Sequence, residues 1–596
     1  MTVSPQGISI QSLYRSYRDG SLIVNRQYQR KLVWTVAEKQ KLIDSILKDY
    51  PLPLFLLAEK SATEPGKSSK LEVIDGMQRL NAIFSYIEHG FLVDDKCFNV
   101  DEFARARQAA DRGDFKTYPS DVARLSAQQC ADLLDYQLAV TSFPGEQDTR
   151  ITDVFGRINS GGKQLSDQER RQAGVLSPFA EMVRTLSAEI RGDVSRETLL
   201  LSEMPEISIE TSRNPHGYAL KAEDIFWSYQ GVLRTGDLRE SDDEQAIADI
   251  CASILWGSPV EASGDFLNQL YSKECEEYKE VSKLLNAYGR DRLEHEVKTV
   301  FSTIRSIIEN YDSSRFCFRR TVYPKPTSNA QKSPFYEAFM AFYELIFKEG
   351  LTPVPDDKIM AALDGLTNRI EIGQKHIRSE DRQNNIKVTK GLIRDQFVTA
   401  DVSALSHGPG MIFDFENSIR RSRTETTRYE FKQGLLRLDN ARQIDPTIIT
   451  TILETICAIA NVGPGADGFL YIGIADKAAD AKRVHELDGI EPIKFDHVEI
   501  VGIEREAKQL GLPIDKHMRL IEDGISQSQL TDPLKTNVLI SLDTIAYKGL
   551  QLVRIRIPRQ TQLTFLGDEC FLRVGSSTNK ATGPQIAAAF KLFSQR

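Results

Sequence analysis

Several features that mark specialised classes of protein are missing from this sequence of 596 residues. No apolar run approaches the ~20 residues of a transmembrane helix, and the first 20 residues lack the basic-then-apolar order of a signal peptide. The seven cysteines are scattered and include no CxxC pair, which argues against a zinc ribbon and against a disulfide framework. We therefore expect a cytoplasmic protein with reduced thiols and no membrane partner.

An overall excess of positive charge is also missing, since the net charge is -9. This charge argues against a generally basic coat for nucleic acid, although a local basic patch is compatible with it. The three tryptophans are dispersed and do not predict a base-stacking platform. Arg315, Arg319 and Arg320 lie close together in the central region, where they could contact phosphate, although we favour a solvated helix face.

The chain is too long for one hydrophobic core, and its patterns change three times along its length. Residues 1–175 alternate β-like runs with amphipathic helices, whereas residues 176–370 show apolar residues at helical spacing. Residues 371–411 are polar and predict one short helix and a linker. Residues 412–596 alternate β and α runs again, so we expect a multidomain α+β protein with a helical middle.

The N-terminal region predicts a helix, two strands and a second helix in close succession. Thr35 and Glu38 form a capping box ahead of an apolar periodic stretch, and prolines end this helix before the strand LFLLAE at 54–59. A second strand follows at 71–75, and apolar residues at i, i+3, i+4 and i+7 predict that a helix begins close to Gln78.

The sequence Asp75-Gly76-Met77-Gln78-Arg79 therefore lies where a strand meets a helix N-terminus. Free backbone N–H groups and the helix dipole favour an anion there, and Gly76 permits a close ligand approach. Arg79 is suited to bind phosphate oxygens, Asp75 to hold Mg²⁺ or orient a water, and Gln78 to position that water. The alternative is a plain helix entry capped by Asp75, with Arg79 as a surface charge.

Two further segments carry related chemistry. Residues 26–34, RQYQRKLVW, place cations and aromatic residues just before the first helix. Residues 155–166, FGRINSGGKQLS, form a polar, glycine-containing turn before a helix start. By itself the second segment predicts either a weak anion nest or a plain loop with an N-cap at Ser166.

Together, YQRxxVW, VIDGMQRL and FxRINSGGxxLSxxE occur in an order that resembles the ParB-like family known by its DGQQR motif. This family, the domain of unknown function numbered 262, is found in GmrSD-type modification-dependent restriction enzymes and related phage-defence proteins. The resemblance covers about residues 10–175, and Met77 replaces the family's first Gln. It implies binding and hydrolysis of a nucleoside triphosphate (NTP), coupled to nucleic-acid cleavage. The implied nucleotide-binding residues are Arg30, Asp75, Gly76, Gln78, Arg79 and Asn159, with Asp75, Gln78 and Arg79 as catalytic residues.

Proteins of the GmrSD type usually end in an HNH nuclease, which needs grouped His and Asn residues around a metal. The eight histidines of this sequence show no such grouping. We therefore expect a different C-terminal domain.

A second candidate site lies in the C-terminal region. Alternation along the strand 429–432 places Glu430 and Lys432 on one face, with Glu425 five residues upstream and Asp476 at the exit of a buried strand. Adjacent strands would gather the three carboxylates around Mg²⁺ or Mn²⁺, with Lys432 orienting water or stabilising the transition state of phosphodiester cleavage. The alternative is an ordinary ion pair on a strand surface.

The segments ExxxxEFK, AIANVGPGADGFLYIGIAD and CFLRVGSSTNKAT resemble the Schlafen-type AlbA_2 domain, over about residues 412–590. The resemblance implies that Glu425, Glu430 and Asp476 are the counterparts of the family's three acidic residues. It also implies nucleic-acid binding, for which we select Arg421, Arg428 and Arg573.

We expect a phage-defence or restriction effector whose NTP-handling N-terminal domain controls nucleic-acid binding and cleavage by the C-terminal domain. DNA is favoured over RNA, and a homo-oligomer is compatible with the sequence. One alternative is a non-cleaving, nucleotide-responsive regulator that binds nucleic acid. Another places cleavage in the N-terminal domain.

Overall fold

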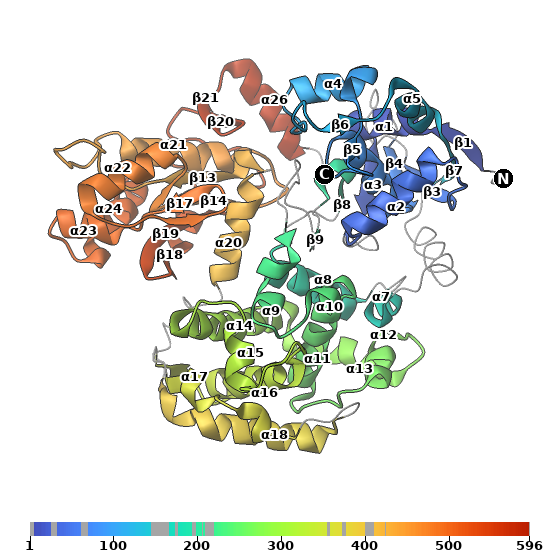
Figure 1. The fold of residues 1–596 in the computed structure, drawn as a ribbon. Helices are drawn as coiled ribbons and strands as arrows, with labels where there is room; N and C mark the ends of the chain where they lie inside the picture. Colours follow the sequence, from blue (N-terminus) through green and yellow to red (C-terminus); the bar gives the residue numbers. More distant parts are fainter. Residues whose placement is uncertain are drawn as a thin grey trace. The chain divides into compact units, whose positions relative to one another are not determined.

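The computed structural model divides the chain into two compact units, Met1–Thr399 and Ala400–Arg596, which are described separately (Figure 1). It has the mixed α and β architecture that the sequence predicts, with a helical middle region between two sheet-containing regions. The structure describes residues 5–594 except 26–31, 61–69, 145–165, 173–176, 194–197, 205–206, 209–219, 355–357, 372–376, 400–410 and 424.

A six-stranded sheet forms the centre of the N-terminal part of unit 1, in the order β1-β7-β3-β4-β2-β8. Its strands are β1 (Gln6–Ser9), β2 (Leu22–Asn25), β3 (Phe55–Lys60), β4 (Lys70–Asp75), β7 (Gln137–Pro144) and β8 (Thr198–Leu200). Strands β2 and β4 are parallel, whereas β3 is antiparallel to β4. The carboxyl ends of β2 and β4 therefore lie at one edge of the sheet, beside the start of β3. A separate pair of short strands, β5 (Lys96–Cys97) and β6 (Ala123–Arg124), is parallel.

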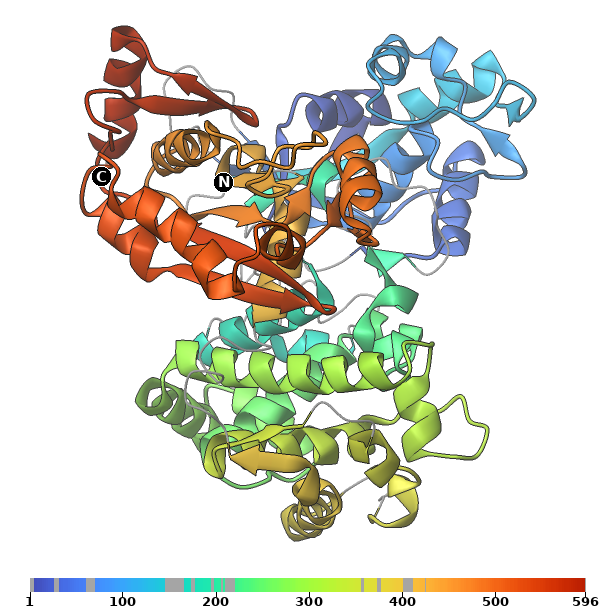
Figure 2. The same ribbon diagram turned by 90° about the vertical axis from the view of Figure 1, so that its left-hand side faces the viewer.

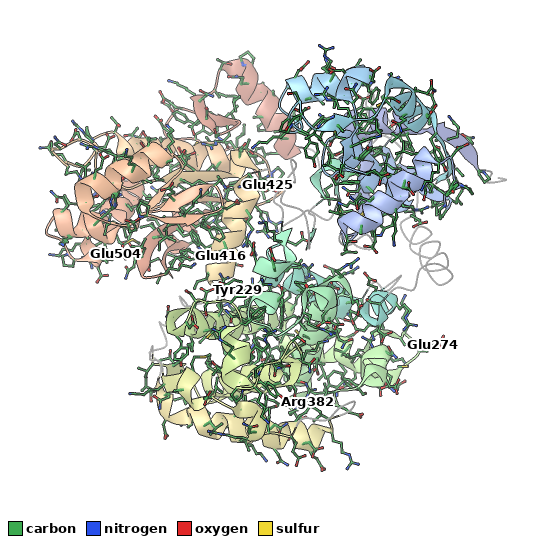
Figure 3. All side chains as sticks on the ribbon, viewed as in Figure 1. Tyr229, Glu274, Arg382, Glu416, Glu425 and Glu504 are labelled. Atoms are coloured by element: carbon green, nitrogen blue, oxygen red, sulfur yellow. The ribbon has the colours of Figure 1, made fainter. Side chains whose placement is uncertain are left out.

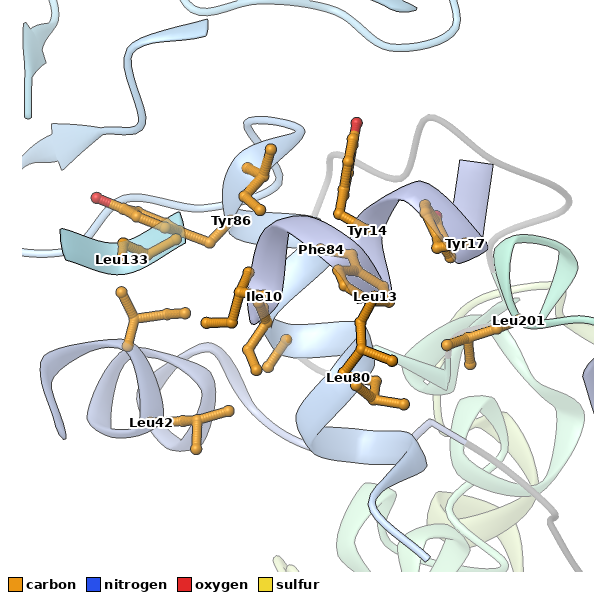
Figure 4. Packing of buried hydrophobic residues seen from close by; sticks show 14 of the residues in the cluster. Ile10, Leu13, Tyr14, Tyr17, Leu42, Leu80, Phe84, Tyr86, Leu133 and Leu201 are labelled. Carbon is orange, nitrogen blue, oxygen red and sulfur yellow. The ribbon is translucent and has the colours of Figure 1, made fainter. Parts of the chain in front are cut away.

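Helices pack their apolar faces against this sheet. They are α1 (Ile10–Arg18), α2 (Val36–Leu47), α3 (Met77–Ile87), α4 (Ala104–Asp111) and α5 (Ala127–Asp135). Figure 4 shows residues of α1, α2, α3 and α5, among them Leu13, Leu42, Leu80 and Leu133, meeting in one core. The capping box at the start of α2 is present as predicted, because it depends only on residues within one helical turn.

The rest of unit 1 is mainly helical. Its elements are α7 (Asp167–Gln172), α8 (Pro178–Arg191), α9 (Phe226–Tyr229), α10 (Thr235–Arg239), α11 (Asp242–Trp256), α12 (Gly264–Tyr271), α13 (Glu276–Tyr288), α14 (Arg290–Tyr311), α15 (Cys317–Val322), α16 (Lys332–Tyr343), α17 (Lys358–Ala362) and α18 (Ser379–Ile393), with short strands β9 (Ile207–Ser208), β10 (Leu220–Lys221), β11 (Leu351–Pro353) and β12 (Phe397–Thr399). Trp227 is fully buried between Phe301 and Phe335, at ring-centroid distances of 5.0 and 5.2 Å. These edge-on aromatic contacts fix the packing of α9, α14 and α16.

Helix α18 lies inside the stretch that the sequence predicts to be a short helix and a linker, residues 371–411. Its Arg382 is buried and pairs with Asp249 of α11 at 2.6 Å. The helix also packs against α16. Unit 1 therefore continues to Thr399, beyond position 370, where the sequence pattern ends the helical region.

Glu337 of α16 should make unit 1 less stable as pH rises. Burial raises the pKa of this carboxyl from 4.5 to about 8, although Arg382 and Asn385 oppose the shift. Between these values the folded protein keeps a proton that the unfolded chain releases. The free energy of unfolding should therefore fall by up to about 1.4 kcal/mol per pH unit.

Urea unfolding at pH 5 and pH 8 tests this expectation. Glu337→Gln should flatten the pH dependence, whereas Glu274→Gln, at an exposed position (Figure 3), should leave it unchanged. If the pH dependence persists in Glu337→Gln, another titratable group causes it.

Unit 2 contains a four-stranded sheet in the order β13-β14-β19-β18. Its strands are β13 (Tyr429–Lys432), β14 (Gly468–Ile472), β18 (Leu542–Tyr547) and β19 (Leu550–Ile557), beside a small sheet of β15 (Ile474–Ala475), β16 (Ile493–Phe495) and β17 (Val498–Ile500). The helices are α20 (Met411–Ser422), α21 (Ile448–Ala460), α22 (Ala478–Asp488), α23 (Glu504–Gln509), α24 (Ile514–Ser526), α25 (Leu534–Ile540) and α26 (Gly583–Ser594). Strands β13 and β14 are parallel, with Glu430 opposite Leu470.

The two faces of this sheet have different cores. Aliphatic residues of α21, α24 and α25 pack on one face, and aromatic residues, with Phe415 of α20, pack on the other. A hairpin of β20 (Phe571–Val574) and β21 (Ser577–Lys580) packs against α21; it is coloured dark red in Figure 2. The side chain of Arg573 reaches Glu430 of β13 from this hairpin.

One predicted strand differs in the structure. The apolar run NVLISLDTIA, residues 537–546, looks like a single strand, but its first part belongs to helix α25, and β18 begins only at Leu542. Val538 is buried in the aliphatic core, and a short apolar run does not by itself distinguish a buried helix from a strand.

Among the helices of the described residues, none has the length and hydropathy of a membrane span.

Candidate functional site

The turn between β4 and α3 has the geometry that the DGMQR sequence predicts. Helix α3 starts at Met77, and Gly76 is its N-cap, with a left-handed φ of 99°. Gly76 has no side chain that could cap this helix start, and backbone N–H groups at a helix start favour an anion. A Cβ at Gly76 would lie 2.4 Å from Cδ1 of Phe55. The position therefore requires glycine, because its φ is positive and because a Cβ would clash with the Phe55 ring.

Arg79 has a structural role in this turn. Its guanidinium donates to the Pro53 and Leu54 carbonyls and to Asp75 Oδ2, at 2.8 Å for the last, and it stacks over the Phe55 ring at 4.3 Å. Burial lowers the pKa of Arg79, and Asp75 opposes the shift. The hydrogen bonds of Arg79 thus go to the turn and to the segment before β3, and its contact with phosphate oxygens stays a prediction.

Gln78 connects the turn to the segment before α2. Its Oε1 accepts hydrogen bonds from the backbone N–H of Val33, at 3.1 Å, and of Trp34, at 3.4 Å. The side-chain oxygen therefore binds backbone N–H groups, whereas the sequence predicts that it positions a water. The residues that it holds directly follow the segment 26–31 and precede the capping box of α2.

A series of contacts continues from α2 into the helical region. Glu38 accepts from the backbone N–H of Thr35 at 2.8 Å and pairs with Arg239 of α10 at 2.7 Å. The neighbouring Glu240 carbonyl accepts from Ser166 Oγ at 2.6 Å. Ser166, the last residue of FGRINSGGKQLS, therefore contacts the residue next to Arg239.

Asp75 is the acidic group of the turn that stays accessible. Its side chain is 37% exposed while it pairs with Arg79. The other two predicted nucleotide-binding residues, Arg30 and Asn159, lie outside the residues that the structure describes.

In unit 2, Glu430 is shared between two cations. Its Oε1 accepts from Lys432 Nζ at 2.6 Å and its Oε2 from Arg573 Nη1 at 2.9 Å. The prediction that Glu430 and Lys432 lie on one face of the strand is confirmed. The structure therefore contains the Glu430–Lys432 ion pair, which is the alternative to a metal site at these residues.

Arg573 is enclosed by hydrogen-bond acceptors. Besides Glu430 it donates to Thr578 Oγ1 at 3.0 Å and to the carbonyls of Thr426 and Tyr429 at 3.3 and 3.2 Å. Its side chain is 1% exposed. These contacts give Arg573 a structural role between the hairpin and β13, and its predicted contact with nucleic acid stays a prediction.

The predicted metal site does not fit the arrangement of its carboxylates. Among the described residues, no three His, Cys, Asp or Glu side chains form a group that could hold a metal ion. Glu430 is bound to Lys432 and Arg573, Asp476 is exposed just after β15, and Glu425 precedes a short 3-10 turn. The described structure therefore does not gather Glu425, Glu430 and Asp476 into one group, and metal binding by these carboxylates stays a prediction.

Two predicted nucleic-acid-binding arginines stabilise local structure. Arg428 donates to the Ala466 carbonyl and so closes the glycine-rich turn before β14. Arg421 hydrogen-bonds the Tyr429 side chain, which counteracts the rise in the pKa of Tyr429 caused by burial. Both side chains are partly exposed.

A buried polar network that the sequence does not predict lies next to β13. Glu506 accepts from the backbone N–H groups of Leu435 and Leu436, at 2.8 and 2.9 Å, and contacts His517 at 3.1 Å. Burial alone would raise the pKa of Glu506, but His517, Arg505 and the two N–H groups hold it below its ordinary value. The network holds the residues that follow β13 in place. No sequence motif predicts it, because its members are far apart in the sequence.

The family described as "GmrSD restriction endonuclease, N-terminal domain" matches residues 10–176, and "Schlafen, AlbA_2" matches residues 425–582. No curated protein matches the chain.

Among solved structures, the crystal structure of the DIP2311 protein from Corynebacterium diphtheriae matches with 19% sequence identity and a TM-score of 0.16. The match covers 26% of this chain and 25% of that chain. The chain thus spans about a quarter of that protein, and so low a TM-score carries no conclusion about the fold. Both resemblances inferred from the motifs are confirmed by the family comparison: the chain combines a GmrSD-type N-terminal domain with a C-terminal Schlafen AlbA_2 domain.

Proposed function

We propose that this protein is a restriction-like phage-defence effector in which an NTP, bound at the β4–α3 turn, controls nucleic-acid processing by the C-terminal domain. The observation that carries the proposal is the uncapped start of α3 on Gly76, beside the accessible carboxylate of Asp75. The turn lies at the edge where the parallel strands β2 and β4 both end. Ligands of open α/β sheets commonly bind outside such carboxyl ends.

The chemistry of the turn suits a triphosphate that arrives with Mg²⁺. Magnesium bound to a nucleotide needs only one or two protein carboxylates in addition to the phosphates, and Asp75 supplies one. The backbone N–H groups at the start of α3 would receive phosphate oxygens. Arg79 contributes by holding the turn and the segment before β3 in position.

The contacts of Gln78 support control of the helical region by the turn. An occupied turn would restrain Gln78, and with it Val33, Trp34 and the start of α2, whose Glu38 pairs with Arg239 of the helical region. These contacts supply a physical route by which nucleotide state reaches α10. They support an energetic coupling between the turn and α10 through direct contacts. A double-mutant cycle of Gln78 and Glu38 can measure this coupling energy.

For the C-terminal domain we propose nucleic-acid binding as the primary activity, since its three acidic residues do not form a metal group. Cleavage of the bound nucleic acid is the second candidate. The description of the N-terminal family, restriction endonuclease, favours it. A homo-oligomer would be compatible with either activity.

The test measures NTP turnover, nucleic-acid binding and cleavage with purified full-length protein and Mg²⁺, for each NTP and for both DNA and RNA. Asp75→Asn should reduce NTP turnover by about 100-fold or more, the usual contribution of a positioned acid or base. The nucleotide dependence of nucleic-acid binding should be lost with it.

Asp44→Asn is the matched control, because Asp44 lies on the neighbouring helix α2 and forms only an exposed pair with Lys48. Thermal unfolding of both variants must resemble that of the wild type. Unchanged turnover in Asp75→Asn would remove the turn from the NTP site. Mg²⁺-dependent cleavage that is abolished by Glu430→Gln at an unchanged melting temperature would select the nuclease candidate.

A further inference from the structure

Two arginines stack on one aromatic ring in the helical region of unit 1, and a third arginine lies in the same segment. The guanidinium carbons of Arg319 and Arg315 lie 3.8 and 4.7 Å from the ring centroid of Phe316. Arg320 follows in the same short segment and donates to the Arg315 carbonyl. We refer to Arg315, Arg319 and Arg320, with Phe316, as the arginine cluster. The sequence suggests an ordinary solvated helix face here, but three of the four residues form one stacked group.

The backbone of the cluster is held firmly. Phe316 has a left-handed φ of 65°, and its N–H donates to the Tyr229 carbonyl at 2.7 Å, while the Arg319 N–H donates to the Gln230 carbonyl at 3.2 Å. Phe318, one residue before Arg319, is buried at 1% exposure. Figure 3 labels Tyr229 in the helical region. The guanidinium groups are thus presented from a preorganised segment, which lowers the entropic cost of binding a ligand.

The charges within the cluster are only partly compensated. Arg320 pairs with Asp312 at 2.9 Å, and Arg315 approaches Glu223 at 3.8 Å. For Arg319, no carboxylate lies within ion-pair distance among the residues that the structure describes. Partial burial lowers the pKa of Arg319, and the positive charges of Arg315 and Arg320 lower it further. Bringing a third guanidinium to this position is unfavourable unless an anion joins the group.

We infer that the arginine cluster binds the phosphates of a nucleic-acid backbone. Guanidinium groups match phosphate oxygens with paired hydrogen bonds, and stacking on Phe316 orients the planes of Arg315 and Arg319. Several cations spread over one segment suit successive phosphates of a strand better than one compact nucleotide. The inference rests on the proposed function, in which the protein binds nucleic acid, and it adds the helical region to the binding surface.

Fluorescence anisotropy with a labelled DNA duplex and an RNA duplex, at several salt concentrations, tests the inference on the full-length protein. The double variant Arg315→Gln/Arg319→Gln should bind at least tenfold more weakly at ~0.15 M salt. Its slope of log affinity against log salt should become shallower by about two, the value for two lost phosphate contacts.

The matched control is Lys279→Gln/Lys283→Gln, which removes the same charge from α13, where both side chains are exposed in local pairs with glutamates. It should leave affinity and slope unchanged, and thermal unfolding should show that both variants are folded. ATP binding, measured in parallel, should be the same in all three proteins.

The outcomes separate the inference from the proposed function. Wild-type protein that binds neither DNA nor RNA would refute the proposed function and the inference together. Wild-type binding that the arginine variant retains, with the wild-type salt slope, would refute the inference alone. A variant that loses ATP affinity but keeps nucleic-acid affinity would also refute it, because the cluster would then be a nucleotide site.

Discussion

Gly76→Ala is expected to destabilise unit 1 by about 3 kcal/mol and to abolish NTP binding. An alanine must adopt the left-handed φ of 99°, which costs ~1–2 kcal/mol, and its Cβ would lie 2.4 Å from Cδ1 of Phe55. The ring has little room to move, since the Arg79 guanidinium lies 4.3 Å from its centroid. Overpacking of this kind costs a further ~1–3 kcal/mol.

Gly113→Ala separates these two costs. Gly113 also has a positive φ, 76°, but a Cβ there would meet nothing within 4 Å. Urea unfolding of both variants should show a loss of about 1 kcal/mol for Gly113→Ala and a clearly larger loss for Gly76→Ala. Equal losses would show that the ring is free to move aside, and retained NTP binding in Gly76→Ala would contradict the assignment of the turn.

Arg573→Gln is expected to destabilise unit 2 by ~3–5 kcal/mol, because removing one partner of a buried ion pair leaves the other uncompensated. Arg573 is 1% exposed and Glu430 is 16% exposed, so water replaces the lost contacts poorly. A melting temperature lower by about 10 °C should follow for a unit of this size. Arg559→Gln, at an exposed position, should change stability by less than ~0.5 kcal/mol.

A second charge change tests whether Glu430 is mainly structural. Glu430→Gln/Arg573→Gln should regain part of the lost stability, since it removes both charges together. Added Mg²⁺ should not change the melting temperature of the wild type through this site. A rise with Mg²⁺ that disappears in Glu430→Gln would instead show that the carboxylate exchanges Arg573 for a metal ion.

The predictions that the structure confirms depend on neighbours in sequence. The capping box of Thr35 and Glu38 and the start of α3 beside Gln78 are contained within single helical turns. The shared face of Glu430 and Lys432 follows from the alternation along one strand. The order of the motifs was likewise sufficient to identify both domains.

The contacts that the sequence does not predict concern long charged side chains. Arg79 binds the carbonyl of Leu54, 25 residues away, and Arg573 binds Glu430, 143 residues away. Each had been assigned to a phosphate because arginine in a motif suits that role. A guanidinium reaches any acceptor within several ångströms, and sequence spacing does not show which acceptor the fold brings near.

The sequence by itself thus determined the two domain types, the helical middle and the place of the β4–α3 turn, because these depend on local patterns and on motif order. Only the tertiary structure shows that Arg79 and Arg573 bind groups far away in the sequence. It also shows that Glu425, Glu430 and Asp476 are not gathered among the described residues, and that Arg319 stacks on Phe316 without a carboxylate among them. The physical reason is that a charge pairs with the nearest compatible group in space. That group is set by the packing of segments far apart in the chain.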